Sequence, residues 1–298
     1  MLHPKLVVLE KSFNSSILTQ IIDPLLEQKQ VELWIKRDDL LHPIISGNKW
    51  RKLKYILNDA LAIKAETIIS MGGAYSNHLH ALAYVGQQLG LHTIGYVRGE
   101  KPKVFSQTLH DMQKWGMDLR FVSRSEYRVL RKLKQHDSLP GIQQGEYWLP
   151  EGGASELALT GVAEILAEIN FNFDVMCVPC GTGTTLAGLV AAIDSKHVCG
   201  FSALKGGSFL INDVDELLIK KKENWSIQLD YHFGGFAKSN EELMQFIENF
   251  SIQHGIELEQ VYTGKMLYGL FDLIKQERFD VGQKIIAIHT GGLQGRKR

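Results

Sequence analysis

Apolar, strand-like runs alternate with helix-like segments along most of the chain, and this alternation limits the possible folds more than any other feature. The apolar runs cover residues 31–35, 67–71, 93–97, 119–122, 175–178, 198–201 and 285–288. Between them, residues 81–89, 156–169 and 241–250 repeat apolar side chains with a helical period near 3.6. Strands that alternate with helices through short glycine-rich joints form parallel sheets covered on both faces. We therefore expect an α/β protein with two open, mostly parallel sheets flanked by helices.

The best internal boundary is the joint at residues 150–153, which reads Pro-Glu-Gly-Gly. The strand–helix units before this joint are sufficient for one open sheet. The units after it, joined by the N-terminal strand, predict a second sheet. We expect a small domain of residues 47–150 and a large domain of residues 1–46 and 151–298.

The charge balance excludes some classes of partner. The 298 residues include 33 Lys and Arg and 33 Asp and Glu, so the formal net charge is zero. This balance gives no electrostatic basis for binding nucleic acid or an anionic membrane. No apolar run approaches the roughly 18 residues of a membrane span, and the N-terminal segment lacks a signal-peptide core. Together with only three cysteines, this predicts a cytoplasmic protein.

The cysteines allow two interpretations. Cys177, Cys180 and Cys199, together with His197, have spacings that a zinc site could use. However, Cys177 lies inside an apolar run, where alternate side chains face opposite ways. We therefore expect three thiols packed as small hydrophobic side chains, and no metal site.

Lys49 stands in an unusual place for a lysine. It follows the flexible pair Gly47-Asn48 and opens an amphipathic segment, which places it in the first turn of a helix. A helix N-terminus carries about half a positive charge and disfavours a cation by roughly 0.3–1 kcal/mol. With Arg51 and Lys52 adding like charge, and with burial, the neutral amine is favoured. A neutral amine is what Schiff-base chemistry requires.

Two strand-to-helix joints could bind anions, because ligands lie beyond the carboxyl ends of parallel strands. In the joint at residues 72–78, Ser76, Asn77 and His78 open a helix and could bind a carboxylate, or Ser76 could simply cap the helix. The joint at residues 180–185 reads Cys-Gly-Thr-Gly-Thr-Thr and could cradle a phosphate. Leu186 replaces the third glycine of a dinucleotide-binding loop, so a monophosphate is the better ligand.

Two later loops complete the pattern. Residues 262–265 read Tyr-Thr-Gly-Lys, and residues 289–292 read His-Thr-Gly-Gly. Tyr262 offers a flat ring, while Thr263 and Thr290 offer neutral hydroxyl groups. With an activated lysine and a phosphate cradle, these loops fit pyridoxal 5'-phosphate, a planar phosphorylated aldehyde.

From residue 36 to residue 292 the sequence resembles the D-cysteine desulfhydrase and 1-aminocyclopropane-1-carboxylate deaminase family. This family belongs to the tryptophan-synthase-β-like, fold type II enzymes that use pyridoxal phosphate. The Gly-Asn-Lys motif that ends at Lys49 and the Gly-Gly-x-x-Ser-Asn motif that ends at Asn77 carry the resemblance. The large domain would then bind the cofactor, and the enzyme would be a homodimer acting on a small amino acid.

The resemblance also implies roles for individual residues. Lys49 would hold the cofactor as an internal aldimine and move protons at the substrate Cα, with Asn48 orienting its loop. Ser76 would contact the substrate carboxylate and is a candidate base, and Tyr262 would lie near the ring. Asn77 would bind the cofactor's phenolic oxygen. The phosphate would be cradled by Gly181, Thr182, Gly183, Thr184 and Thr185. The substrate would meet Ser76, Asn77, His78 and Phe236.

Thr263 and Thr290 bear on the reaction. Deaminase-type members carry Glu and Leu at these two positions, whereas desulfhydrase-type members carry threonine. A carboxylate facing the pyridine nitrogen keeps it protonated, and a hydroxyl makes a weaker electron sink. We therefore expect Cα deprotonation and β-elimination, giving a 2-oxo acid and ammonia.

Some features leave the substrate open. Phe236 stands where the family has a tyrosine, and His80 where it has an arginine. The sequence ends soon after Gly292, without the family's aromatic C-terminal segment. The alternatives are a 1-aminocyclopropane-1-carboxylate deaminase, a β-replacement enzyme acting on an L-amino acid, a binding protein with little catalysis and a nucleotide-binding protein.

Overall fold

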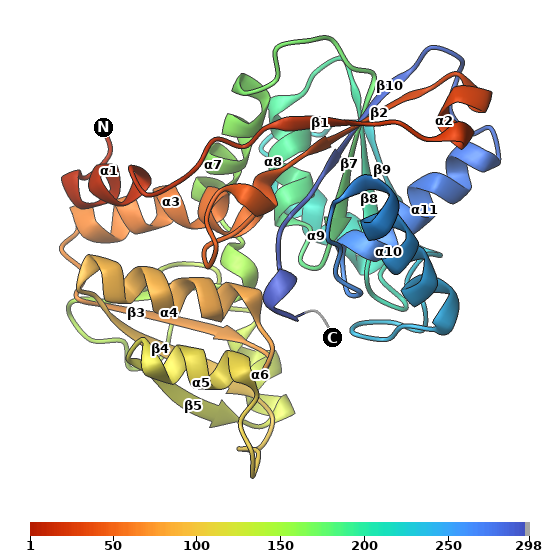
Figure 1. Cartoon of the computed structure of the whole chain (residues 1–298). Helices are drawn as coiled ribbons and strands as arrows, with labels where there is room; N and C mark the ends of the chain where they lie inside the picture. The colour runs from red at the N-terminus through yellow and green to blue at the C-terminus, as the bar shows by residue number, and fades with distance from the viewer. Residues whose placement is uncertain (296–298) are drawn as a thin grey trace.

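The computed structural model describes residues 1–295 and contains two separate sheets flanked by helices (Figure 1). The larger sheet has six strands in the order β1-β2-β10-β7-β8-β9. These strands are β1 (Leu18–Ile21), β2 (Glu32–Lys36), β10 (Lys284–Ile288), β7 (Val175–Cys180), β8 (His197–Ser202) and β9 (Trp225–Gln228). Only the β1–β2 pair is antiparallel among the strand pairs of this described sheet.

The smaller sheet has four parallel strands in the order β5-β4-β3-β6. They are β5 (Met117–Val122), β4 (His92–Arg98), β3 (Thr67–Gly72) and β6 (Glu146–Leu149). The predicted fold class is therefore confirmed, and each strand predicted from an apolar run is present. The sequence did not predict β1, β6 and β9, which have four residues each and lie at sheet edges.

Helices cover both sheets. They are α1 (Pro4–Glu10), α2 (Pro24–Lys29), α3 (Asn48–Ala62), α4 (Asn77–Leu89), α5 (Gln107–Lys114), α6 (Arg124–Leu130), α7 (Glu156–Ala167), α8 (Thr184–Ala192), α9 (Phe209–Leu217), α10 (Glu241–His254) and α11 (Thr263–Lys275). Short 3-10 turns occur at η1 (Asp38–Leu40), η2 (Glu151–Gly153) and η3 (Leu293–Gly295). Within residues 1–295, no helix has the length and apolar character needed to cross a bilayer.

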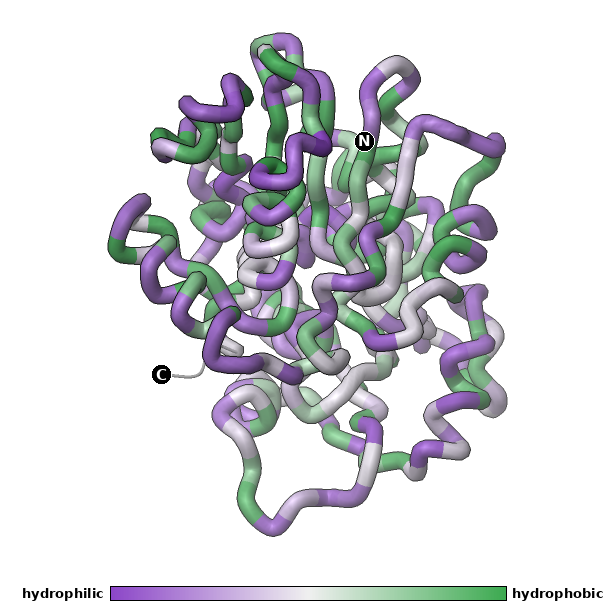
Figure 2. The backbone as a smooth tube through the Cα atoms, turned by 90° about the vertical axis from the view of Figure 1, so that its right-hand side faces the viewer, coloured by the Kyte–Doolittle hydropathy of each residue, from purple (hydrophilic) through white to green (hydrophobic). Residues whose placement is uncertain are grey.

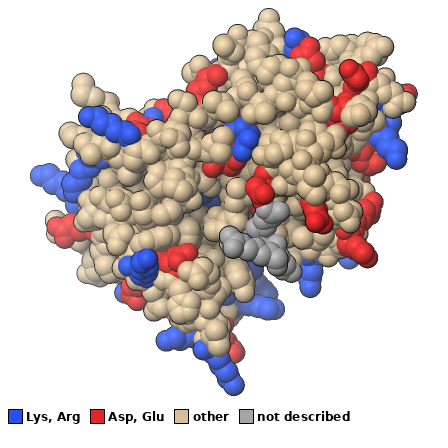
Figure 3. Space-filling view, viewed as in Figure 1, with Lys and Arg blue, Asp and Glu red and all other residues tan. Residues whose placement is uncertain are grey.

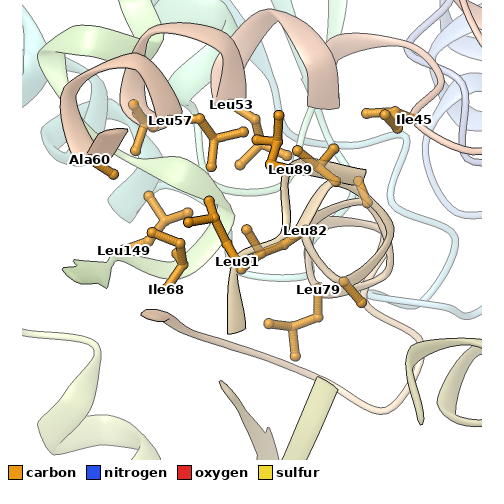
Figure 4. Packing of buried hydrophobic residues seen from close by; sticks show 14 of the residues in the cluster. Ile45, Leu53, Leu57, Ala60, Ile68, Leu79, Leu82, Leu89, Leu91 and Leu149 are labelled. Atoms are coloured by element: carbon orange, nitrogen blue, oxygen red, sulfur yellow. The ribbon is translucent and has the colours of Figure 1, made fainter. Parts of the chain in front are cut away.

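The helix α3 packs its apolar stripe against the small sheet. Leu53 and Leu57 point toward Leu82 and Leu89 of α4 and toward Leu149 of β6 (Figure 4). Full burial of a leucine side chain contributes about 1.5–3 kcal/mol, so this cluster holds α3 firmly in place.

The first helix joins the same apolar cluster. Leu6 and Leu9 of α1 pack with the buried side chains of α3 and α4, although the sequence analysis assigned this segment to the large domain. The domain boundaries, residues 47–150 against the remainder, stay a proposal.

Figure 2 shows how hydrophobic and hydrophilic residues alternate along the folded chain.

The opposite side of α3 meets α7, which flanks the large sheet. A Cβ built on Gly161 of α7 would lie 1.9 Å from the carbonyl oxygen of Arg51, so the two helix backbones touch there. The Arg51 guanidinium pairs with Asp38 at 3.0 Å and also with Glu168. Lys36 of β2 pairs with Glu168 at 2.6 Å. These contacts fix α3, and the lysine in its first turn, relative to the large sheet.

The three cysteines pack as the sequence analysis expected. Cys177, Cys180 and Cys199 are buried in the apolar layers of β7 and β8, as predicted. In residues 1–295, no group of three His, Cys, Asp or Glu side chains is arranged to hold a metal ion. On the face shown in Figure 3, positive and negative side chains are interspersed.

Candidate active site

The Gly-Asn-Lys segment lies directly against the loop that follows the last strand. Gly47 caps the N-terminus of α3 with a φ of 63°, a left-handed conformation that favours glycine. A Cβ on Gly47 would lie 1.9 Å from the carbonyl oxygen of Thr290. The backbone N–H of Gly292 donates to Ser46 Oγ at 3.4 Å. Two loops that are distant in sequence therefore form one wall of the site.

Lys49 occupies the first turn of α3, as predicted. Removal of its amine from water lowers its pKa to about 8, and the buried carboxylate of Glu259 opposes part of this shift. The amine donates a hydrogen bond to the side-chain oxygen of Asn48. Arg51 was expected to add like charge, but its guanidinium is directed into the pairs with Asp38 and Glu168. Burial is therefore the main reason that about a tenth of the Lys49 amine is neutral at pH 7.

The glycine–threonine turn at residues 181–185 lies beside Lys49. Gly183 caps α8 with a φ of 74°, and no side chain caps the helix. The first N–H groups of α8 are thus available for an anion. Asn48 Nδ2 donates to Thr185 Oγ1 at 2.8 Å, which ties the lysine loop to this turn. Thr182 and Thr184 share a hydrogen bond of 3.1 Å on the same turn.

A second lysine, Lys52, is also buried, and from the sequence it was expected only to add like charge beside Lys49. Its exposed fraction is 4%. Burial lowers its pKa well below the usual value, and the charge of Lys49 lowers it further. Among the described residues, its amine has no hydrogen-bond or ion-pair partner. A bound phosphate would supply the missing counter-charge.

Two glycines connect Lys52 to the phosphate cradle. A Cβ on Gly153 would lie 3.7 Å from Cβ of Lys52, and a Cβ on Gly152 would lie 2.9 Å from the Thr182 hydroxyl. The Pro-Glu-Gly-Gly joint therefore contacts both the side chain of Lys52 and the turn at residues 181–185. Larger side chains at either glycine would fill this space.

His78 is a buried residue in the first turn of α4. Its Nε2 contacts Ser70 Oγ at 2.9 Å, and Ser70 donates its own proton to the carbonyl oxygen of Leu149. His78 Nε2 is therefore the donor, and the unprotonated Nδ1 has no partner in the described part of the chain. Burial, with Lys52 and Lys49 nearby, lowers the His78 pKa well below its usual value. The imidazole is thus a neutral acceptor beside the two lysines.

Ser76 and Asn77 open α4 at the mouth of the site. Ser76 Oγ accepts the N–H of Leu79 at 3.2 Å, so Ser76 caps the helix and keeps its hydroxyl proton for a ligand. Asn77 Oδ1 accepts a hydrogen bond of 2.6 Å from Gln294. His80 lies one turn further along, where it contacts Asp111 of α5 at 3.2 Å.

Tyr262 covers the glycine turn from the other side. A Cβ on Gly181 would lie 3.0 Å from the Tyr262 ring, and burial raises the pKa of its phenol. Phe236 meets the Tyr262 ring edge-on at a centroid distance of 6.0 Å. Phe236 thus lies close to the predicted site residues, although 47% of it is exposed.

Glu259 organises the Tyr-Thr-Gly-Lys loop and was missed by the sequence analysis. Only 2% of it is exposed, and its carboxylate accepts the N–H groups of Val261, Tyr262 and Thr263 at 2.6–2.7 Å. No local signal in the sequence distinguishes Glu259, because glutamate is not a favoured helix-capping residue.

The two threonines differ in their surroundings. The Thr263 hydroxyl donates to Glu259 Oε1 at 3.2 Å and accepts the N–H of Glu259 at 3.3 Å. It is therefore engaged within its own loop. Thr290 is buried, and its hydroxyl makes no hydrogen bond to the described residues. Of the pair, Thr290 is better placed to contact a ligand.

Taken together, the site joins a partly neutral amine, an uncapped helix start with hydroxyl groups, and a buried amine that lacks a counter-charge. A planar aldehyde with a phosphate fits this set, because Lys49 matches the aldehyde and the cradle with Lys52 matches the phosphate.

The chain is similar to known proteins over nearly its full length. The profile of the family described as "Pyridoxal-phosphate dependent enzyme" matches residues 19–291. A Pyrococcus horikoshii protein provisionally named 1-aminocyclopropane-1-carboxylate deaminase is 31% identical, over 99% of this chain and 96% of its own. The mitochondrial bifunctional D-cysteine desulfhydrase/1-aminocyclopropane-1-carboxylate deaminase of Arabidopsis thaliana is 31% identical, over 89% of this chain and 73% of its own.

A solved structure has the same fold. The crystal structure of an ACC deaminase homologue superimposes with a TM-score of 0.80 at 28% identity and covers 99% of this chain and 96% of that chain. This likeness and the family match confirm the resemblance derived from the sequence motifs.

Proposed function

Because the chain belongs to the pyridoxal-phosphate dependent enzyme family, we propose that it is a lyase that removes a β-substituent from a small amino acid such as D-cysteine. Its products are a 2-oxo acid and ammonia, with hydrosulfide as the leaving group. The observation that carries the proposal is the hydrogen bond of 2.8 Å between Asn48 and Thr185. It supports the proposal because it ties the loop of Lys49 to the turn that would bind the phosphate, as a cofactor held at both ends requires.

The residues for holding the cofactor are assigned by charge and geometry. The N–H groups at the start of α8 and the hydroxyls of Thr182, Thr184 and Thr185 would bind its phosphate. Lys52 would supply the positive charge. When bound, the cofactor offers an aldehyde for an amine and an electron-withdrawing ring that stabilises negative charge at the substrate Cα.

Lys49 is the candidate base. An amine with a pKa of about 8 is partly unprotonated near neutral pH and can take the proton from Cα. The electrons of the Cα–H bond then form the Cα–Cβ double bond, and sulfur leaves with the electrons of the Cβ–S bond. Water converts the resulting enamine into the 2-oxo acid and ammonia. The Ser76 hydroxyl and the start of α4 would hold the substrate carboxylate.

The choice of elimination rests on the threonine pair. Thr290 offers a neutral hydroxyl, and Thr263 is held by Glu259. Deaminase-type members have a glutamate directly after the tyrosine. In this chain the residue after Tyr262 is Thr263, so this position carries no carboxylate. A hydroxyl leaves the cofactor ring a weaker electron sink, which is sufficient when the leaving group is good.

The alternative is a 1-aminocyclopropane-1-carboxylate deaminase. The names of the Pyrococcus horikoshii and Arabidopsis thaliana relatives support it. The test compares the rate of 2-oxo acid formation from D-cysteine, L-cysteine and 1-aminocyclopropane-1-carboxylate, with sulfide release measured in parallel. Faster turnover of the cyclopropane overturns the threonine argument. Visible absorbance without a spectral change on adding any of these amino acids indicates binding without catalysis. The Lys49→Ala variant is the control, since it should lose both the visible band and turnover.

A further inference from the structure

The short turn after the last strand reaches across the site to Asn77. Gln294 of η3 donates from Nε2 to Asn77 Oδ1 at 2.6 Å, although the two residues are 217 positions apart. The contact joins the C-terminal turn of the large sheet to the first residue of α4. It links the two sheets at the mouth of the site.

This contact fixes which end of the Asn77 carboxamide faces inward. Because Oδ1 is held by Gln294, the NH2 group is directed away from it. A Cβ on Gly292 would lie 2.6 Å from Asn77 Nδ2, so the NH2 group lies against the His-Thr-Gly-Gly loop. That loop in turn packs on the Gly-Asn-Lys segment. Asn77 thus presents two N–H donors to the interior of the site, and its acceptor faces outward.

The turn that carries Gln294 is itself positioned by neighbouring loops. Gln260 Nε2 donates to the carbonyl oxygen of Gly295 at 3.0 Å, and Gln260 directly follows Glu259. The N–H of Gly295 donates to the carbonyl oxygen of Gly292 at 3.1 Å. The backbone on both sides of Gln294 is therefore fixed, and its side chain is directed toward Asn77.

We propose that Gln294 is a positioning residue, which orients Asn77 so that its N–H donors face the bound cofactor. The inference rests on the proposed function, because it assigns a task at the same site. A donor facing an oxygen of the cofactor stabilises the ionised form of that oxygen, whereas an inward carbonyl would repel it. Gln294 touches neither the cofactor nor the substrate and acts through Asn77.

The sharpest test is Gln294→Glu, because a carboxylate can only accept. It would recruit Asn77 Nδ2 and turn Oδ1 inward. In the purified holoenzyme we expect the cofactor to dissociate roughly tenfold faster, and the pH midpoint of its visible absorbance to rise by about one unit. Gln294→Leu removes the contact without reversing the amide, so its effect should be about threefold. Gln113→Glu, an exposed residue of α5, makes the same charge change far from Asn77 and should behave like the wild type.

A double-variant comparison separates orientation from charge. If Gln294 acts through Asn77, Gln294→Glu should change neither the rate of cofactor dissociation nor the pH midpoint of the visible absorbance appreciably in an Asn77→Ala background. Equal effects in both backgrounds overturn the inference, as does a Gln294→Glu protein that matches Gln113→Glu. A wild-type protein that holds no pyridoxal phosphate instead overturns the proposed function. Thermal unfolding of each variant identifies any that fail to fold, and Gln294→Leu then carries the comparison.

Discussion

Asn48 bridges Lys49 and Thr185: its side-chain oxygen accepts from the lysine amine, and its Nδ2 donates to the threonine hydroxyl at 2.8 Å. The Asn48 carboxamide thus contacts both the Lys49 amine, which we propose reacts with the aldehyde, and the turn at residues 181–185, which we propose binds the phosphate. The Asn48 side chain therefore sets the distance between the Lys49 amine and Thr185.

Removing this bridge should loosen the cofactor without abolishing its attachment. Asn48→Leu and Thr185→Val should each raise the dissociation constant for pyridoxal phosphate about three- to tenfold, since both lose the Asn48–Thr185 hydrogen bond, and Asn48→Leu also loses the bond from Lys49. The double variant should be hardly worse than the more affected single variant, because the bond between the two side chains is already lost in each single variant. Titration of the visible band measures all three. Additive losses in the double variant contradict the bridge.

Lys49 should make cofactor uptake depend on pH. Its amine must be neutral to attack, and its pKa is lowered to about 8. In cofactor-free protein, the rate of appearance of the visible band should rise about tenfold per pH unit well below pH 8 and level off above it. Stopped-flow absorbance measures this rate. A midpoint near the ordinary lysine pKa would show that burial does not lower the pKa of Lys49.

Replacing Lys52 should change stability and binding in opposite directions. In the cofactor-free protein its buried charge lacks a partner, so Lys52→Met should raise the free energy of unfolding by about 1–3 kcal/mol at pH 7. The same variant should bind pyridoxal phosphate at least tenfold more weakly, because the phosphate loses a cation. Chemical denaturation and cofactor titration measure the two effects.

Lys54 supplies the matched control for this change. It lies in the same helix and pairs with Glu10 at 2.8 Å and Glu164 at 2.9 Å. Lys54→Met should therefore lower stability and leave cofactor binding unchanged.

The lowered pKa of Lys52 also fixes the sign of a pH effect. The unfolded chain binds this proton more tightly than the folded chain. The stability of cofactor-free wild-type protein should therefore rise with pH from the lowered pKa up to the ordinary lysine range. The slope should be smaller in Lys52→Met, since one lysine with a lowered pKa is then removed, while Lys49 and Lys265 still contribute. Equal slopes in both proteins contradict the assignment.

Gly47 should tolerate no side chain. A Cβ there would overlap the carbonyl oxygen of Thr290 at 1.9 Å, in addition to the strain of a φ of 63°. Gly90 has a similar φ of 69° at the end of α4, but its Cβ would meet nothing within 4 Å. Gly90→Ala should therefore lower stability by only about 1–2 kcal/mol, and Gly47→Ala by clearly more. Thermal unfolding of both variants measures the difference. Equal losses would show that the loop at Thr290 can move to make room for the added methyl group.

The sequence predicted what depends on local pattern. Long apolar runs became the inner strands, and Lys49 lies in the first turn of a helix because Gly47 and the apolar period of α3 are local signals. The strands β1, β6 and β9 escaped prediction because four residues at a sheet edge leave a weak pattern. Their pairing partners, not their own residues, define them.

The parts of the site that were missed depend on long-range packing. Lys52 looks like one more exposed cation in a basic helix, but it is buried, and its neighbours include Gly153, about a hundred positions away. Glu259 lies in the mostly polar segment Glu257–Gln260, where a solvated carboxylate is the usual expectation. Its carboxylate also accepts the Thr263 hydroxyl, which engages that hydroxyl within its own loop. Spacing alone does not show which hydroxyl remains available.

The backbone contact between Gly161 and Arg51 has a mechanical consequence. Because α3 is seated on α7 at this point and clamped by Asp38 and Glu168, the reactive amine shares one rigid platform with the phosphate cradle. The opposite side of the same helix packs on the small sheet, so the position of this amine is set by both sheets at once.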